Sequence, residues 1–195
     1  MLANEILKVL STQYITQEEM KKRITELCHN DIYVNSKNSK PAVNRFKFIK
    51  RECKKGSRGI FKKVQKSEKY GLVWTNGYIL CTFHDMDLPP DMLAKEDFET
   101  LNVDNTILKC IGKEKANTVL EYKTIKARLS SCPTTKEKDN NIIEVSGALF
   151  STRNIEKVFK FYNVNKLEMY VKKNCVAYGF IDNETPFIIC PIYKK

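Results

Sequence analysis

A short turn between two apolar runs limits what this chain can fold into more than any other feature. Thr75-Asn76-Gly77 separates the run 70–74 from the run 78–83, and both runs are rich in aromatic and aliphatic residues. Asn-Gly supplies two residues that tolerate a positive φ, as a tight type I′ turn requires. The flanking residues suit a buried pleated surface. The sequence therefore predicts a β-hairpin over 70–83, with Asn76 and Gly77 at the centre of its turn.

A second apolar run closes the chain over 187–193 and carries Pro191 near its end. Proline cannot donate a hydrogen bond to a neighbouring strand, so it is confined to sheet edges and strand ends. We expect a strand here that lies at a sheet edge or ends at the proline.

Two helices are expected from capping residues followed by apolar spacing. Thr16 and Glu19 form a capping box at the start of a helix over 17–29. Ser151 or Thr152 caps a second helix. Its apolar positions recur with the helical period; they are Ile155, Val158, Phe159 and Tyr162.

The remaining segments indicate strands and loops. Strands are expected at 41–49, 106–111, 118–122, 142–145, 167–172 and 175–181. Segment 53–69 has the composition of a loop or of loosely ordered strand ends, and 130–141 has that of an exposed loop. A unit of one helix and several strands thus occurs twice. The predicted fold class is α+β, with two helices on antiparallel sheets.

Positive charge is concentrated in one segment. The net charge is +11, and residues 45–69 hold eleven Lys or Arg against two Glu, a net of 11 − 2 = +9. Such a concentration favours a polyanionic partner, most often nucleic acid. The alternative is a solvated lysine-rich loop that keeps the protein soluble.

Cysteine usage and hydropathy bear on location. The seven cysteines are scattered singly, which indicates reduced thiols in a cytoplasmic protein. Residues 1–10 are too short and polar for a secretory core, and no apolar run of about 18 residues exists. We expect a cytoplasmic protein with no membrane contact.

No motif for catalysis stands out. The chain has neither a phosphate-binding glycine loop nor a dinucleotide fingerprint. Cys81 and His84 are the only closely spaced pair with metal-ligand character, and a single pair is more typical of a strand end than of a metal site. An acidic segment over 85–97 is a candidate divalent-cation site of a nuclease, although Pro89 and Pro90 favour a solvated turn. We expect no enzyme, no cofactor and no metal.

The hairpin and the closing run together resemble two signatures of the bacterial sliding clamp, the ring-shaped β subunit of DNA polymerase III. The matching residues are Thr75-Asn76-Gly77-Tyr78-Ile79-Leu80 and Phe187-Ile188-Ile189-Cys190-Pro191-Ile192-Tyr193. The resemblance implies duplicated βαβββ units with both helices on one face. Asn76 and Ile79 depart from the aspartate and arginine of the family. The family subunit has three domains, so residues 1–195 would be a single clamp-like domain, with a basic loop near 50–69 and an insertion near 85–140. A reduced or phage-type relative fits that size.

The resemblance also implies two binding surfaces. The family's helices face DNA without reading its sequence, and its hairpin and tail form an apolar pocket for peptide motifs of replication proteins. With the basic segment included, the nucleic-acid-binding residues would be Lys21, Lys22, Arg23, Lys54, Lys55, Lys62, Lys63, Arg153, Lys157 and Lys160. The peptide-binding residues would be Thr75, Gly77, Tyr78, Leu80, Ile189, Cys190, Pro191 and Ile192. For each of the latter the alternative is ordinary strand core.

Two functions from different classes remain open beside the nuclease. One is a clamp-like, processivity-type protein of DNA replication, working as a homo-oligomer or in a larger assembly. The other is a basic nucleic-acid-binding regulator of another fold that uses 45–69 as its contact and is encoded by a phage or mobile element.

Overall fold

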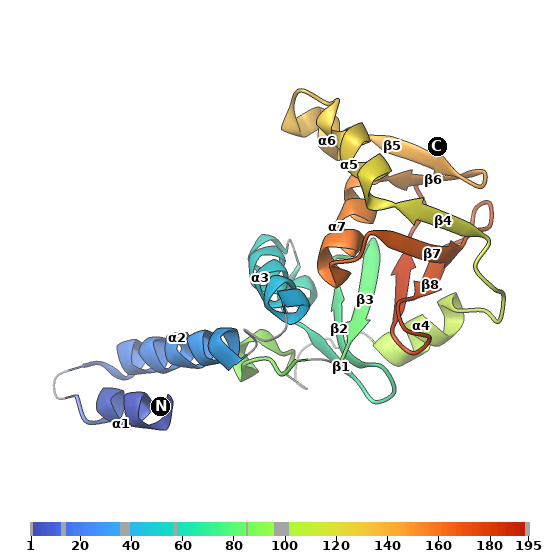
Figure 1. Cartoon of the computed structure of the whole chain (residues 1–195). Helices are drawn as coiled ribbons and strands as arrows, with labels where there is room; N and C mark the ends of the chain where they lie inside the picture. The colour runs from blue at the N-terminus through green and yellow to red at the C-terminus, as the bar shows by residue number, and fades with distance from the viewer. Residues whose placement is uncertain are drawn as a thin grey trace.

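The chain folds into a mixed α+β structure built on one seven-stranded sheet (Figure 1). The computed structural model describes residues 2–12, 15–35, 40–56, 58–84, 86–95 and 102–193. The strand order is β1-β2-β3-β9-β8-β7-β4, and every neighbouring pair is antiparallel. A separate hairpin, β5-β6, adds a second small sheet. The predicted fold class is confirmed.

The elements have the following bounds. The helices are α1 Leu2–Leu10, α2 Gln17–Asn35, α3 Lys40–Lys55, α4 Val103–Cys110, α5 Tyr122–Ser130, α6 Thr135–Asn140 and α7 Thr152–Tyr162, with short 3-10 turns η2 Gly59–Lys62 and η3 Pro90–Met92. The strands are β1 Gln65–Ser67, β2 Gly71–Thr75, β3 Ile79–Phe83, β4 Thr118–Glu121, β5 Ile142–Val145, β6 Ala148–Ser151, β7 Lys166–Tyr170, β8 Ala177–Phe180 and β9 Pro186–Ile189.

A helix followed by three strands occurs twice and generates most of the fold. The first unit is α3-β1-β2-β3, and the second is α7-β7-β8-β9, which β6 precedes. The two units meet where β3 pairs with β9, with Leu80 opposite Ile188. Since each unit brings its helix, α3 and α7 pack against each other. The repeated helix-and-strand pattern is therefore present, but α3 takes the place that the sequence suggested for the helix near 17–29.

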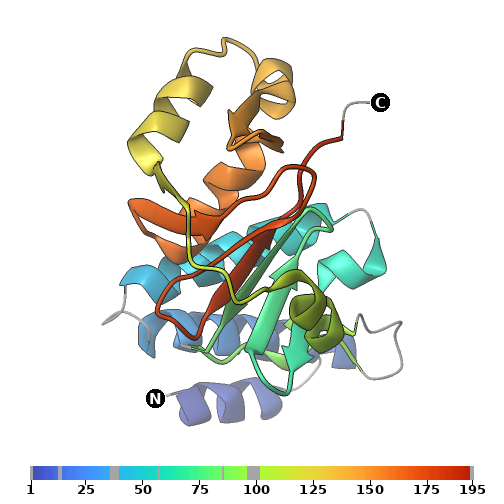
Figure 2. The same cartoon turned by 90° about the vertical axis from the view of Figure 1, so that its right-hand side faces the viewer.

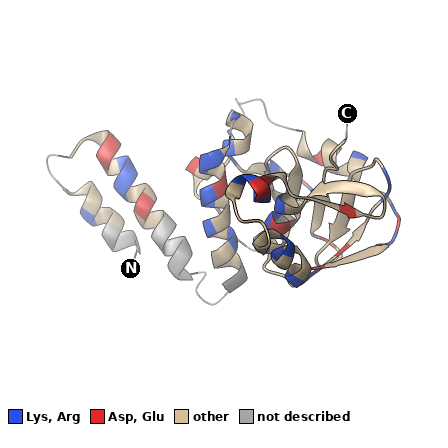
Figure 3. Ribbon diagram, turned by 90° about the horizontal axis from the view of Figure 1, so that it is seen from above, with Lys and Arg blue, Asp and Glu red and all other residues tan. Residues whose placement is uncertain are grey.

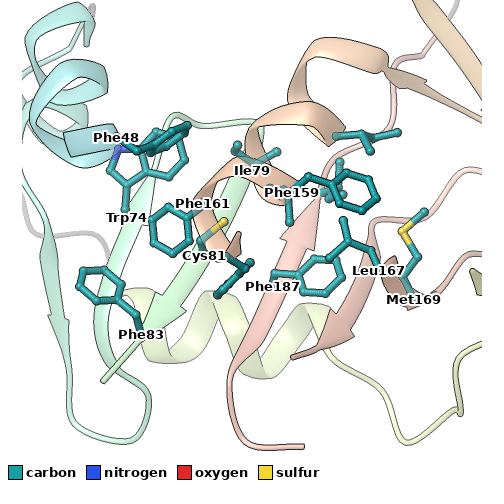
Figure 4. Close-up of a cluster of buried hydrophobic side chains, with 14 of the residues drawn as sticks. Phe48, Trp74, Ile79, Cys81, Phe83, Phe159, Phe161, Leu167, Met169 and Phe187 are labelled. Atoms are coloured by element: carbon teal, nitrogen blue, oxygen red, sulfur yellow. The ribbon is translucent and has the colours of Figure 1, made fainter. Parts of the chain in front are cut away.

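Side chains alternate between the two faces of the sheet along each strand, and apolar residues occupy both sets of positions in the central strands. In β3, Ile79, Cys81 and Phe83 belong to the large core under α3 and α7 (Figure 4). Leu80 points the other way and joins a smaller core with Val103 and Ile107 of α4. Figure 2 shows α4 in front of the strands and α3 behind them. The sheet thus separates a two-helix face from an α4 face.

The segment 41–49, expected as a strand, is helical in α3. Phe46, Ile49 and Cys53 are buried at i, i+3 and i+7, which is the spacing of one helix face. The alternation of Phe46 and Phe48 in the sequence suggested a strand. In the structure both rings are buried although they are two residues apart on a helix. Phe48 reaches the aromatic cluster instead, with its ring centroid 5.0 Å from that of Trp74.

Three further segments that were expected to be strand or loop contain helix in the structure. Residues 106–110 fall on α4, and Ile111 is its C-cap; Asn102 caps the start of this helix by accepting a hydrogen bond from the Asn105 N–H at 2.9 Å. The expected loop 130–141 contains α6, capped by Thr134. The expected loop 53–69 holds the end of α3, η2 and β1. Side-chain caps at Asn102 and Thr134 begin α4 and α6, whereas η2 has no side-chain cap.

The hairpin is confirmed, but its turn is shifted by one residue. Thr75 pairs with Leu80, and Gly77 and Tyr78 occupy the centre of the turn. Gly77 has a φ of 89°, and Tyr78 is not among the residues with positive φ, so the turn is not the type I′ turn expected from Asn-Gly. Asn76 instead caps the turn, because its Oδ1 accepts hydrogen bonds from the N–H groups of Tyr78 and Ile79 at 3.0 and 2.9 Å.

The closing run forms β9, which lies in the middle of the sheet between β3 and β8. The strand ends at Ile189, before Pro191, so the expectation of a strand end is confirmed and that of an edge is wrong. Pro186 stands at the first position of the strand, where proline is tolerated.

The helix expected at 17–29 is present as α2 and continues to Asn35. Thr16 accepts a hydrogen bond from the Glu19 N–H at 3.2 Å, as the capping box predicts. Helices α1 and α2 pack against each other and form an arm at one side of the sheet (Figure 1). Within the described ranges, no helix has the length and apolar character needed to cross a bilayer.

Candidate nucleic-acid interface

The outer side of α3 carries a stripe of positive charge. Lys47, Arg51 and Lys54 are exposed at i, i+4 and i+7, so they lie on one helix face. The opposite face packs into the core through Ile49 and Cys53. The amphipathic period of α3 therefore fixes where its cations point.

Helix α7 carries a matching stripe. Arg153, Lys157 and Lys160 follow the same i, i+4, i+7 spacing, and all three are at least partly exposed. Ser151 caps the helix by accepting a hydrogen bond from the Asn154 N–H at 3.3 Å, and Asn163 ends it with φ of 55°. We call these six residues of α3 and α7 the basic face (Figure 3).

A buried ion pair ties the two stripes together. The Lys157 Nζ lies 2.8 Å from Glu52 Oε2, and the Glu52 side chain is only 6% exposed. Burial by itself would raise the pKa of Glu52, but hydrogen bonding and charge from Lys157, helped by Lys55 and Arg51, lower it overall. Glu52 is consequently ionised at neutral pH and holds α3 and α7 at a fixed spacing.

A second carboxylate organises α7 itself. Glu156 lies 3.0 Å from Arg153 Nη1 and 2.6 Å from Lys160 Nζ. Four of the six cations of the basic face contact these two largely buried carboxylates, Arg51 and Lys157 at Glu52 and Arg153 and Lys160 at Glu156. Six cations against two carboxylates leave the surface with a positive excess. Arginine and lysine in such an array bind phosphates without reading base sequence.

A polar cleft of about 500 Å³ opens beside the basic face, and we call it the basic cleft. Its walls come from α3, η2, α6, α7 and the β2-β3 hairpin with its tip. The lining side chains include Arg51, Lys55, Arg153, Lys157, Lys160, Glu52, Asp139, Glu156, Phe61, Trp74 and Tyr78.

An apolar pocket of about 280 Å³ lies on the α4 face of the sheet. Leu80 and Ile188 form its floor, and Val103 and Thr106 of α4 form one wall. The ring of Phe61 covers the hairpin tip so closely that a Cβ added to Gly77 would lie 2.9 Å from Phe61 Cζ. Phe61 and Tyr78 line both this apolar pocket and the basic cleft.

The basic residues singled out in the sequence lie at four places in the structure. Arg153, Lys157 and Lys160 are on α7, and Lys54 and Lys55 are at the end of α3. Lys62 and Lys63 are at η2, where Lys63 donates a hydrogen bond to the Asp91 carbonyl. Lys21, Lys22 and Arg23 are exposed on α2, outside the basic face, and Arg23 pairs with Glu19 at 2.8 Å.

Lys47 and Arg51 were missed as members of this surface. Assignment of 41–49 to a strand concealed their helical relation to Lys54. The signal in the sequence was the spacing of three cations at i, i+4 and i+7, with the apolar residues Phe48, Ile49 and Cys53 among them.

The proposed peptide-binding residues divide between the two faces of the sheet. Five of them line the apolar pocket: Thr75, Gly77, Tyr78, Leu80 and Cys190. Ile189 is fully buried in the core under the helices, and Ile188 takes its place in the pocket. Pro191 is buried and Ile192 is partly exposed, and neither lines the pocket.

The residues considered for metal binding do not gather into a site within the described residues. Cys81 is buried in the core, whereas His84 is exposed. Among the side chains that the structure describes, no three His, Cys, Asp or Glu are grouped to hold a metal ion. Asp85, Glu96 and Asp97 of the acidic segment lie outside the described residues.

Solved structures that are similar to this chain include two beta subunits of DNA polymerase III. The subunit from Thermotoga maritima aligns with 13% identity and a TM-score of 0.36, over 64% of this chain and 42% of that one. The subunit from Borrelia burgdorferi, solved in complex with a natural product, aligns with 11% identity and a TM-score of 0.47, over 78% of this chain and 62% of that one. This chain thus spans less than two thirds of either subunit, and likenesses at these identities establish neither family nor function. The sequence matches no protein-family model and no curated protein.

Proposed function

We propose that this protein is a non-catalytic DNA-binding accessory protein of replication, of the sliding-clamp type. The observation that carries the proposal is the basic face: two packed helices that present Lys47, Arg51, Lys54, Arg153, Lys157 and Lys160 on one side of a continuous sheet. A rigid array of cations without base-reading side chains favours contact with phosphates along a duplex. Its affinity would come from counter-ion release and would not depend on sequence.

The proposal is tested by binding to two duplexes of unrelated sequence, measured by fluorescence anisotropy at low salt. We expect dissociation constants that agree within about twofold, because phosphate contacts carry no sequence information. Replacing Lys21, Lys22 and Arg23 by glutamine should change these values little, since α2 lies outside the basic face. A strong preference for one duplex, or a large loss from the α2 variant, would contradict the proposal.

Assembly is part of the same proposal, because a protein that encircles DNA needs several domains. Light scattering over a range of concentrations reports whether copies of the chain associate. A monomer at every concentration would restrict the role to that of an accessory to a larger partner.

We also propose that the apolar pocket receives a short peptide of a replication partner. Leu80, Val103 and Ile188 provide an apolar floor and wall, and the exposed Tyr78 stands at the rim. Such grooves bind an aromatic or leucine anchor by excluding water from it. The floor of the pocket lies on the α4 face, away from the α3 and α7 cations, while Phe61 and Tyr78 separate the pocket from the basic cleft.

Filling the pocket tests this second surface. Thr106 is exposed on α4 and lines the pocket, so Thr106→Trp should occupy it without disturbing the core. Peptides carrying clamp-binding motifs should bind the unchanged protein and bind the variant at least about tenfold more weakly. Thr124→Trp, at an exposed position on α5, is the matched control and should bind as the unchanged protein does. Equal binding by the Thr106 variant would place the peptide elsewhere.

A further inference from the structure

The basic cleft combines two kinds of side chain that the basic face alone does not. One wall carries cations from α3 and α7, and aromatic rings come from η2, from β2 and from the hairpin tip. Tyr78 is 64% exposed, and Phe61 is half-buried beside it. Trp74 forms part of the lining and belongs to the core cluster (Figure 4). Tyr78 thus presents most of its side chain to solvent at the rim of a cationic cleft.

The charges of the cleft are unbalanced. Five cations, Arg51, Lys55, Arg153, Lys157 and Lys160, face three carboxylates, Glu52, Asp139 and Glu156. Arg153 contacts two of these carboxylates, with its Nη1 3.0 Å from Glu156 and its Nε 3.6 Å from Asp139. A guanidinium has five N–H donors, so Arg153 keeps several for a ligand. The carboxylates orient the cations without neutralising them.

The size of the cleft restricts what enters it. A volume of about 500 Å³ lies in the range of sites for small molecules and cofactors. A double helix cannot enter such a cleft, because its bases are stacked and paired inside the duplex. A single unpaired nucleotide presents both a phosphate for the cations and a base face for the aromatic rim.

We propose that the basic cleft holds a nucleotide of single-stranded nucleic acid, with its phosphate at Arg153 and Lys157 and its base stacked on Tyr78. The inference rests on the proposed function, because four cations of the cleft also belong to the basic face. It adds a preference for single-stranded segments, such as those beside a duplex end or gap. Stacking on tyrosine accepts any base, so this preference is independent of sequence.

The single tryptophan of the chain reports on the cleft that it lines. We expect a thymidylate oligonucleotide of about 12 residues to change the Trp74 fluorescence on titration. A blunt duplex should bind to the basic face with a smaller change in this signal. Thymidine monophosphate should bind far more weakly than the oligonucleotide, since it lacks neighbouring phosphates.

Substitutions separate the cleft from the rest of the basic face. Tyr78→Ala should weaken oligonucleotide binding about tenfold and leave duplex binding within twofold, and Tyr78→Phe should restore it because the ring is kept. Arg153→Gln should weaken oligonucleotide binding more than duplex binding. Lys54→Gln, on the basic face and outside the cleft lining, should weaken duplex binding and leave the Trp74 signal unchanged. Circular dichroism verifies that each variant is folded.

The outcomes distinguish this inference from the proposed function. Duplex binding together with an oligonucleotide affinity that ignores Tyr78 would overturn the inference and leave the proposed function standing. Oligonucleotide binding that depends on Tyr78, without duplex binding, would overturn the proposed function and leave the inference standing. Equal affinity for thymidine monophosphate and the oligonucleotide would assign the cleft to a free nucleotide and overturn the single-strand inference.

Discussion

Replacing Phe161 with alanine is expected to lower the free energy of unfolding by about 3–5 kcal/mol. The Phe161 side chain is fully buried at the centre of an aromatic cluster. Its ring centroid lies 4.9 Å from Tyr162, 5.5 Å from Phe83, 5.7 Å from Phe48 and 5.8 Å from Trp74. Truncation removes buried apolar area and leaves a cavity that these large rings cannot close.

The site of this substitution matters for function as well as for stability. Phe161 belongs to α7, and its ring joins Phe48 of α3 to Phe83 of β3. The same cluster therefore fixes the spacing of the two helices that carry the basic face. Urea unfolding followed by circular dichroism measures the loss, and Tyr193→Ala, at a 64% exposed position, is the control with an expected change within about 0.5 kcal/mol. A loss below about 1 kcal/mol for Phe161→Ala would contradict the description of the core.

Removing three cations from the basic face is expected to weaken duplex binding by about 100-fold at about 0.1 M salt. The variant is Lys47→Gln, Lys54→Gln and Lys160→Gln. It leaves the Lys157–Glu52 pair intact, and Arg153 stays with Glu156, so neither buried carboxylate loses its last partner. The loss then reports phosphate contacts and not a change of fold.

A charge-matched control makes this second prediction specific. Lys115, Lys172 and Lys173 are exposed and lie outside α3 and α7. Replacing these three by glutamine lowers the net charge equally and should weaken duplex binding by less than about threefold, through long-range attraction alone. Equal losses in the two variants would show that net charge, and not the basic face, governs binding.

Local signals in the sequence predicted those parts of the fold that local interactions decide. The hairpin over 70–83, the capping of α2 by Thr16 and the start of α7 at Ser151 all depend on residues within one turn. The spacing of Ile155, Val158, Phe159 and Tyr162 predicted the buried face of α7 because a helix of this length presents one clear stripe.

Other features depended on contacts that the sequence does not display. Helix α3 was mistaken for a strand because Phe48 is buried by distant partners, Trp74 and Phe161, and so disturbs the helical pattern. The central position of β9 follows from pairing with β3, more than a hundred residues earlier. Two-sided burial of the sheet hid which of the neighbouring residues Ile188 and Ile189 faces α4 and lines the apolar pocket.

The candidate site could be predicted from the sequence only where its helix could be predicted. The cations of α7 could be named because that helix was predicted, whereas Lys47 and Arg51 could not be placed without α3. The basic cleft assembles α3, α6, α7 and the hairpin tip, and no local pattern links these segments. Its combination of Arg153 with Tyr78 is visible only in the folded chain.

The salt dependence of duplex binding tests the central claim most directly. If the six cations of the basic face contact phosphates, the logarithm of the association constant should fall linearly with the logarithm of salt concentration, with a slope of about −5. The Lys47, Lys54 and Lys160 variant should reduce the magnitude of this slope by about 3, and the control variant should leave it unchanged. A slope near zero, or the same slope for all three proteins, would contradict the assignment of α3 and α7 as a DNA-binding surface.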